Sequence, residues 1–175
     1  MPPTGQRTAS FHGYLLTVGI SHMKRTVLIL VAVIVLAVLV FFLRPTATVS
    51  LKVYFINSTL DPRVTCEKVF PVVRSVSATQ AVGRAALTEL LGGPTEAERT
   101  AGYSTTIPTG VRIQSLTIQD GIAHVDFDAT LERSVGGSCR VSAIRQQITE
   151  TLKQFPTVQS VIISIDGRTQ DILQP

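Results

Sequence analysis

Three side chains in the C-terminal half of the chain could carry out acid–base chemistry. His124, Asp126 and Asp128 alternate along the sequence, and alternate positions of a strand share one face. Two carboxylates beside an imidazole can exchange protons with a substrate or bind a cation. Further oxygen ligands are missing nearby, whereas Ca²⁺ takes six to eight, and no G-x-S-x-G elbow supplies a nucleophile. We therefore favour a polar strand end, and keep a hydrolase that uses these three residues as an alternative.

Two glycine pairs could shape a phosphate-binding loop. Gly92-Gly93-Pro94 follows a predicted helix, where it is typical of a C-cap and stop signal. Gly136-Gly137-Ser138 precedes a helix, with Arg140 in the first turn, and could bind an anion there. The lysine and spacing of a P-loop are missing. The sequence therefore favours a loop and an N-cap, and we predict no cofactor and no metal site.

The two cysteines, Cys66 and Cys139, lie far apart in the sequence. Their number and separation do not suit a zinc site. An even pair outside the reducing cytoplasm favours a disulfide, and two separate buried thiols are the alternative. We predict the disulfide, which would stabilise the fold by about 4 kcal/mol through its long loop.

An apolar segment near the N-terminus separates the C-terminal region, which contains both cysteines, from a basic flank. Residues 27–43 are uninterrupted apolar residues, too long for a typical secretory signal and long enough to nearly span a bilayer. The nearest cysteine is Cys66, so a lipoprotein signal is excluded. We predict an uncleaved transmembrane helix over 27–43, rather than a cleaved signal or a buried core helix.

The basic flank sets the expected orientation. Arg7, Lys24 and Arg25 precede the helix without any acidic residue, which places residues 1–26 in the cytoplasm by the positive-inside rule. Translation could also start at Met23. The expected arrangement is a single-pass protein of a bacterial-type cell membrane, with a linker over 44–50, an external domain over 51–168 and a tail over 169–175.

The external region carries no net charge. Residues 46–175 contain 3 Lys and 9 Arg against 6 Asp and 6 Glu, so 12 minus 12 leaves zero. The formal excess of +4 therefore comes from the residues around the apolar segment. A neutral domain lacks the basic surface that nucleic acid requires, so we expect no nucleic-acid partner.

The external region alternates strand and helix patterns. Strand patterns over 51–57 and 69–76 precede a helix pattern that ends at Leu91, and Pro71 places the second strand at an edge, at a bulge or near its own start. Asp120-Gly121 predicts a hairpin, a second helix follows over 138–155, and the apolar run 161–163 predicts a central last strand. The predicted fold class is α+β: a small mixed β-sheet with two helices packed on one face, preceded by one transmembrane helix.

Short motifs follow one another through this region, at residues 53–55, 90–94, 107–110, 123–127, 155–158 and 165–167. In this order they resemble the sporulation and spore germination domain, GerMN, over residues 51–168. The motif residues expected to be structural are Gly92, Gly93, Pro94, Ile107, Pro108, Asp126, Pro156, Asp166 and Gly167.

The resemblance implies an extracytoplasmic α+β module, similar to ring-building domains, that assembles envelope complexes through protein–protein contact. The family has no established catalytic residues, so the predicted function is a non-catalytic assembly module that binds envelope proteins or itself. A cell-wall glycan module that binds peptidoglycan is an alternative, although the chain has no Trp and the external region has two tyrosines, Tyr54 and Tyr103.

Overall fold

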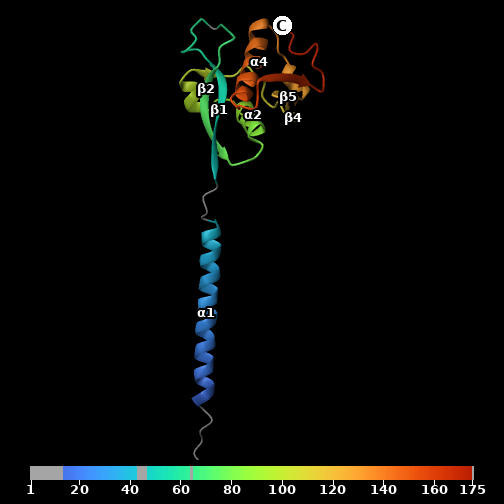
Figure 1. Ribbon diagram of the computed structural model, residues 1–175. Helices are drawn as coiled ribbons and strands as arrows, with labels where there is room; N and C mark the ends of the chain where they lie inside the picture. The colour runs from blue at the N-terminus through green and yellow to red at the C-terminus, as the bar shows by residue number, and fades with distance from the viewer. Residues whose placement is uncertain (1–13, 43–46, 64, 175) are drawn as a thin grey trace, which may run out of the picture. The chain divides into compact units, whose positions relative to one another are not determined.

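The computed structural model describes residues 14–42, 47–63 and 65–174, with side chains from residue 24 onward. The chain divides into two compact units, residues 1–45 and residues 46–175 (Figure 1). The predicted cytoplasmic segment lies partly outside the described residues, as do residues 44–46 of the predicted linker.

The first unit contains one long helix, α1 (Tyr14–Phe42). Every described side chain of this helix, from Lys24 to Phe42, is exposed. This stretch is long and apolar enough to cross a membrane, by length and composition. The helix begins before the predicted start at residue 27, because helical structure continues through the basic flank.

The second unit begins with a three-stranded antiparallel sheet in the order β2-β1-β3. Its strands are β1 (Thr48–Asn57), β2 (Phe70–Ser77) and the short β3 (Tyr103–Ser104). Leu51, Val53 and Phe55 alternate along β1 and are buried. Strand β1 starts inside the predicted linker, because Thr48 already pairs with Ser77 of β2.

A second three-stranded sheet has the order β4-β5-β6. Strands β4 (Ile113–Gln119) and β5 (Ile122–Phe127) form the predicted hairpin around Asp120-Gly121, and β6 (Ser160–Ile165) runs parallel to β5. The prediction of a central last strand was wrong, because β6 lies at an edge and its Ile162 is exposed.

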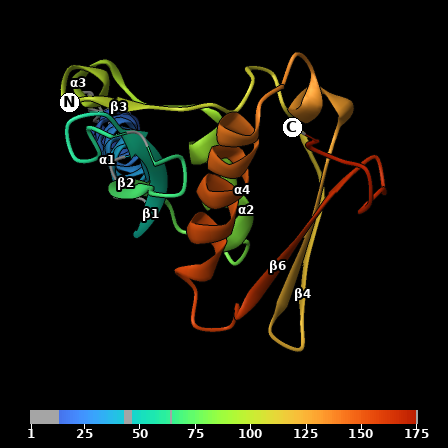
Figure 2. The same ribbon diagram turned by 90° about the horizontal axis from the view of Figure 1, so that it is seen from above.

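Two helices lie between the sheets (Figure 2). Helix α2 (Val82–Leu91) packs against β1 and β4, and helix α4 (Ser138–Lys153) packs against β1 and β6. A short helix α3 (Glu96–Thr100) precedes β3, and a 3-10 turn η1 (Ala129–Glu132) follows β5. The buried row Val141, Ile144, Ile148 and Leu152 joins α4 to the core at helical spacing.

The α+β class is confirmed, but the strands form two sheets where one was expected. The reason lies at the edge of β1 that faces away from β2. Gln154, directly after α4, accepts from Lys52 N at 2.7 Å and donates to Lys52 O at 2.5 Å. Thr151 Oγ1 accepts from Tyr54 N at 3.1 Å. Side chains of the helix therefore satisfy the backbone groups that a further strand would have used.

The end of the chain also belongs to the second unit. Ile172 and Leu173, inside the predicted tail, are buried against the core. Arg145 of α4 donates to Ile172 O at 3.0 Å. The compact unit therefore extends beyond residue 168.

Candidate functional site

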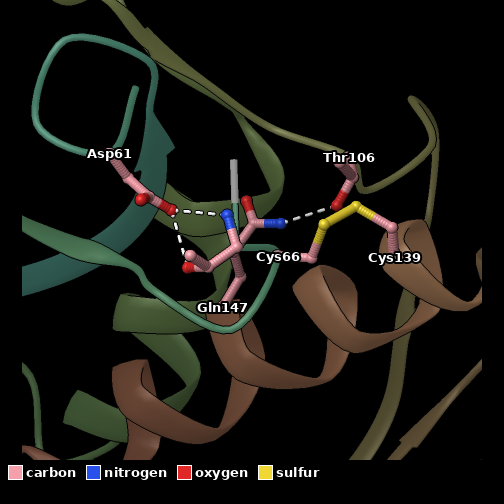
Figure 3. Close-up of a disulfide and its surroundings, with 6 residues drawn as sticks. Asp61, Cys66, Thr106, Cys139 and Gln147 are labelled. Atoms are coloured by element: carbon pink, nitrogen blue, oxygen red, sulfur yellow. Dashed lines mark hydrogen bonds between the residues drawn. A yellow bond between two sulfur atoms is a disulfide. The ribbon is translucent and has the colours of Figure 1, made fainter. Parts of the chain in front are cut away.

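The disulfide between Cys66 and Cys139 is present, as predicted (Figure 3). Cys139 belongs to the first turn of α4, and Cys66 to the connection between β1 and β2. The two Cα atoms are 5.1 Å apart, and 73 residues separate the cysteines. The bond therefore fixes an irregular connection to the beginning of the central helix.

Asp61 stabilises the same connection between β1 and β2 by hydrogen bonds to a residue within it. Its Oδ2 accepts from Thr65 N at 2.8 Å and from Thr65 Oγ1 at 2.7 Å (Figure 3). The hydrogen bond from the Thr65 hydroxyl, followed by that from its backbone N–H, lowers the pKa of Asp61 below its ordinary value. Asp61 is therefore ionised at neutral pH, and it orders the residue directly before Cys66.

A cavity of about 470 Å³ lies beside the disulfide. Its walls are mainly apolar, with Asp61, Lys68 and Arg140 as the charged groups. Arg140 donates to Thr106 O at 3.3 Å and to Ser134 O at 3.0 Å. The residues that line the cavity are Ile56, Asn57, Ser58, Asp61, Cys66, Lys68, Ser104, Thr106, Gly136, Gly137, Cys139, Arg140 and Ala143.

The glycine pair predicted to precede α4 forms part of this cavity. Gly137 is the N-cap residue, with φ of 87°, and no side-chain hydrogen bond caps the helix there within the described residues. Of the three residues Gly136-Gly137-Ser138 at which an N-cap was expected, the cap is Gly137 and not the serine, because the helix begins at Ser138 itself. The first turn of α4 and Arg140 give this end of the cavity a positive character.

Gln147 is a buried polar residue that the sequence did not identify. It follows Cys139 and Ala143 at helical spacing, so the three residues lie in one row. Its Nε2 donates to Thr106 Oγ1 at 2.9 Å and to Ala143 O at 3.1 Å. Its Oε1 has no hydrogen-bond partner among the described residues. This side chain joins α4 to the segment that follows β3, next to the disulfide (Figure 3).

The three residues considered for acid–base chemistry have separate environments. Asp126 Oδ1 accepts from Ser164 Oγ at 2.6 Å and from Gly167 N at 3.0 Å. His124 is exposed on the same outer face of β5, opposite Thr117 and Ile162. Asp126 therefore stabilises the turn after β6.

Asp128 forms its hydrogen bonds at a different place, beyond the end of β5. It accepts from Arg112 N and Arg112 Nε, both at 3.1 Å, and from Thr130 Oγ1 at 3.2 Å. Burial raises the pKa of Asp128, but these hydrogen bonds and the Arg112 charge outweigh burial and lower the pKa overall. Within the described residues, no group of three His, Cys, Asp or Glu side chains could hold a metal ion.

The motif residues lie at turns and in the core. Gly93 has φ of 74° and donates to Leu90 O at the end of α2, and Pro94 is buried. Asp166 and Gly167 have φ of 49° and 77° in the turn after β6. The others are Gly92, which is the C-cap residue of α2, Ile107, which is buried, Pro108, and Pro156 shortly after α4.

The fold described above agrees with the result of a comparison against protein-family models. The family model described as "Germane: Sporulation and spore germination" matches residues 52–171. The chain belongs to this family. The Germane match includes both sheets, the two central helices and both cysteines.

Solved Germane-type structures show the same fold. The tandem GerMN domains of the sporulation protein GerM from Bacillus subtilis superpose with a TM-score of 0.53 at 19% identity. This match covers 70% of the present chain and 41% of the GerM chain, so the chain spans less than half of that structure. The first GerMN domain of GerM alone gives a TM-score of 0.51 at 23% identity, covering 69% and 85%. No curated protein matches the chain.

Proposed function

We propose that the chain is a membrane-anchored, extracytoplasmic assembly module of the cell envelope that acts by protein–protein contact and not by catalysis. The observation that carries the proposal is the Cys66–Cys139 disulfide in a Germane domain that follows an apolar helix. Disulfides persist in oxidising compartments and are rare in the cytoplasm.

Two independent features support the same orientation. Lys24 and Arg25 precede the apolar stretch, which favours a cytoplasmic N-terminal side. The disulfide favours an external C-terminal side. One feature depends on charge and the other on redox chemistry, so their agreement strengthens the proposed single-pass arrangement.

The proposal of a non-catalytic role rests on how the polar residues are used. Asp126 and Asp128 each accept hydrogen bonds that close turns or fix neighbouring strands. Their partners come from different elements, and each carboxylate already has a structural task. Substituting His124, Asp126 and Asp128 together in a way that preserved folding but abolished a cellular phenotype would revive the hydrolase alternative.

Orientation can be tested by thiol labelling in cells. The native cysteines are paired, so Thr109→Cys, at an exposed position, introduces one free thiol. We expect a membrane-impermeant maleimide to label this variant equally before and after the cells are permeabilised. Labelling only after permeabilisation would contradict the proposed orientation.

Assembly can be tested by lysine-directed crosslinking of the full-length protein in cells, followed by mass spectrometry. We expect crosslinked products that contain a second envelope protein or a second copy of the chain. A control chain in which the Germane domain is replaced by an unrelated secreted domain should lose these products. If no protein is recovered but the domain is retained on purified cell-wall sacculi, the peptidoglycan-binding alternative is favoured instead.

A further inference from the structure

Within the described part of the chain, strand β2 has one edge without a neighbouring strand. The hydrogen-bond pattern shows which residues face this edge. Ala78 N donates to Ala47 O at 2.8 Å, so residues 47 and 78 form a hydrogen-bonded pair. Antiparallel pairs alternate between hydrogen-bonded and non-bonded, so the pairs 48–77, 50–75, 52–73 and 54–71 are non-bonded. Lys52 and Tyr54 fit this assignment, because their N–H groups point away from β2 toward Gln154 and Thr151.

The β2 members of these non-bonded pairs therefore direct their backbone groups to the open edge. They are Pro71, Val73, Ser75 and Ser77. Val73, Ser75 and Ser77 each offer an N–H and a C=O, whereas Pro71 offers a C=O alone. Among the described residues, no hydrogen bond to these outward groups is present.

Apart from Pro71 near its start, the open edge lacks the usual protection against pairing among the described residues. Edge strands are commonly protected by charged side chains, bulges or covering elements. The outward residues of β2 are uncharged, and all four are exposed. Val73 is 64% exposed, the highest value for a large apolar side chain in the second unit's described part.

The other edges are shorter, interrupted or covered. The far edge of β1 is covered by Thr151 and Gln154. Strand β4 has an irregularity between Ile113 and Ser115, and Arg84 donates to Ile113 O at 3.0 Å. Strand β3 has two residues, and β6 is shorter than β2. Strand β2 is therefore the most suitable edge for adding a strand.

We propose that this edge pairs with β2 of a second copy of the chain, antiparallel and with Ser75 opposite Ser75. This inference rests on the proposed assembly function and names the partner and the surface. The register follows from Arg74 and Pro71: centring the pair on residue 74 would set two Arg74 side chains opposite each other, whereas centring it on Ser75 leaves Pro71, which lacks a donor, outside the hydrogen-bonded pairs. Centring the pair on Ser75 sets Val73 opposite Ser77, so every available N–H finds a C=O. Two bonds per hydrogen-bonded pair give about six across the junction.

The side chains and the charge of the domain suit a second copy. Ser75 meets its own symmetry mate, and Arg74 faces Val76 of the other copy, so no like charges are opposed. Arg74 is already bound to Glu98 of its own chain at 2.7 Å. The external region is neutral overall, so two copies do not repel each other. A common membrane anchor would raise the local concentration of copies.

The test uses single-cysteine variants of the full-length protein in native membranes, treated with a short bis-maleimide. In the proposed register the two Ser75 Cα atoms lie about 5.5 Å apart. We expect Ser75→Cys to give a crosslinked band of twice the chain mass. Thr109→Cys, at an exposed position in a turn outside the strands, should give none.

The register is tested by mixing variants. Differently tagged chains carrying Val73→Cys and Ser77→Cys should crosslink to each other more strongly than either does to itself. Adding Val73→Lys to Ser75→Cys should abolish the Ser75 dimer, while adding Thr109→Lys should leave it unchanged.

The results separate this proposal from the assembly function. If Ser75→Cys crosslinks to itself no more than Thr109→Cys does, the pairing of two β2 edges is overturned. Lysine-directed crosslinking that still recovers envelope proteins would then leave the assembly function standing. Crosslinking of Ser75→Cys to a different protein alone would overturn the second-copy proposal and identify the partner of this edge.

Discussion

The two ends of α4 are attached to the rest of the domain by different chemistry. At the first turn, Cys139 forms a covalent bond with Cys66. At the other end, Thr151 in the last turn and Gln154 directly after it form hydrogen bonds with the backbone of β1. None of the described side chains between residues 58 and 69, which include Cys66, is both apolar and buried. A disulfide thus attaches the helix to a connection where apolar burial contributes little to stability. Hydrogen bonds are sufficient to attach the other end of the helix to a regular strand.

Breaking the covalent end should have the largest effect. Replacing Cys66 and Cys139 with alanine removes the cross-link over 73 residues, and the chain-entropy model gives a loss of about 4 kcal/mol in the free energy of unfolding. Urea unfolding of the detergent-solubilised chain, followed by circular dichroism, measures this loss. With a reductant present, the unaltered chain should behave like the variant; equal stability with and without the bond would contradict the interpretation.

Breaking the hydrogen-bonded end should have a smaller effect. Gln154→Ala removes both bonds to Lys52, and we expect a loss of about 1–2 kcal/mol because each bond contributes modestly in water. The same urea unfolding experiment applies. Gln159→Ala, at an exposed position, is the matched control and should change stability by less than about 0.5 kcal/mol. Equal losses in the two variants would mean that Gln154 does not support the edge of β1.

Lowering the pH should weaken the connection at the covalent end of α4, and we expect this to have the smallest effect on stability of the three changes. The folded pKa of Asp61 is lowered by the Thr65 hydrogen bonds. Its stabilising contribution is therefore present above the unfolded pKa of about 3.9 and is lost as the pH falls through the folded pKa. Asp61→Asn should lose less stability than the unaltered chain when the pH is lowered from neutral to strongly acidic values. Asp171→Asn, an exposed control, should retain the full acid sensitivity.

Local patterns in the sequence predicted much of the fold. The Asp120-Gly121 turn, the stop at Gly93-Pro94 and the spacing along α4 depend on neighbouring residues, and each was found. The division into two sheets was not predicted, because it depends on Gln154 and Lys52, which lie 102 residues apart. A polar residue after a helix gives no sign that it covers a strand edge.

The candidate site was predicted in part. The pairing of Cys66 with Cys139 was predicted from number and compartment, and the structure confirms it. The role of Gln147 was missed, since a glutamine within an amphipathic helix is ordinarily on the solvent side. The sequence signal that could have indicated its burial was its position in a row with Cys139 and Ala143 at helical spacing. The edge position of β6 was also missed, because an apolar run does not reveal whether one side of a strand lacks a neighbour.

The distance along the chain between β1 and its covering side chains affects how the protein is made. Synthesis proceeds from the N-terminus, so β1 and β2 are complete long before Gln154, 102 residues after Lys52, has been added. The hairpin is complete at Ser77, and at about 5–20 residues per second the interval from there to Gln154 lasts roughly 4–15 s. During that time a nascent hairpin exposes both of its edges, and the edge that is closed in the finished domain is as open to wrong partners as the edge that stays open.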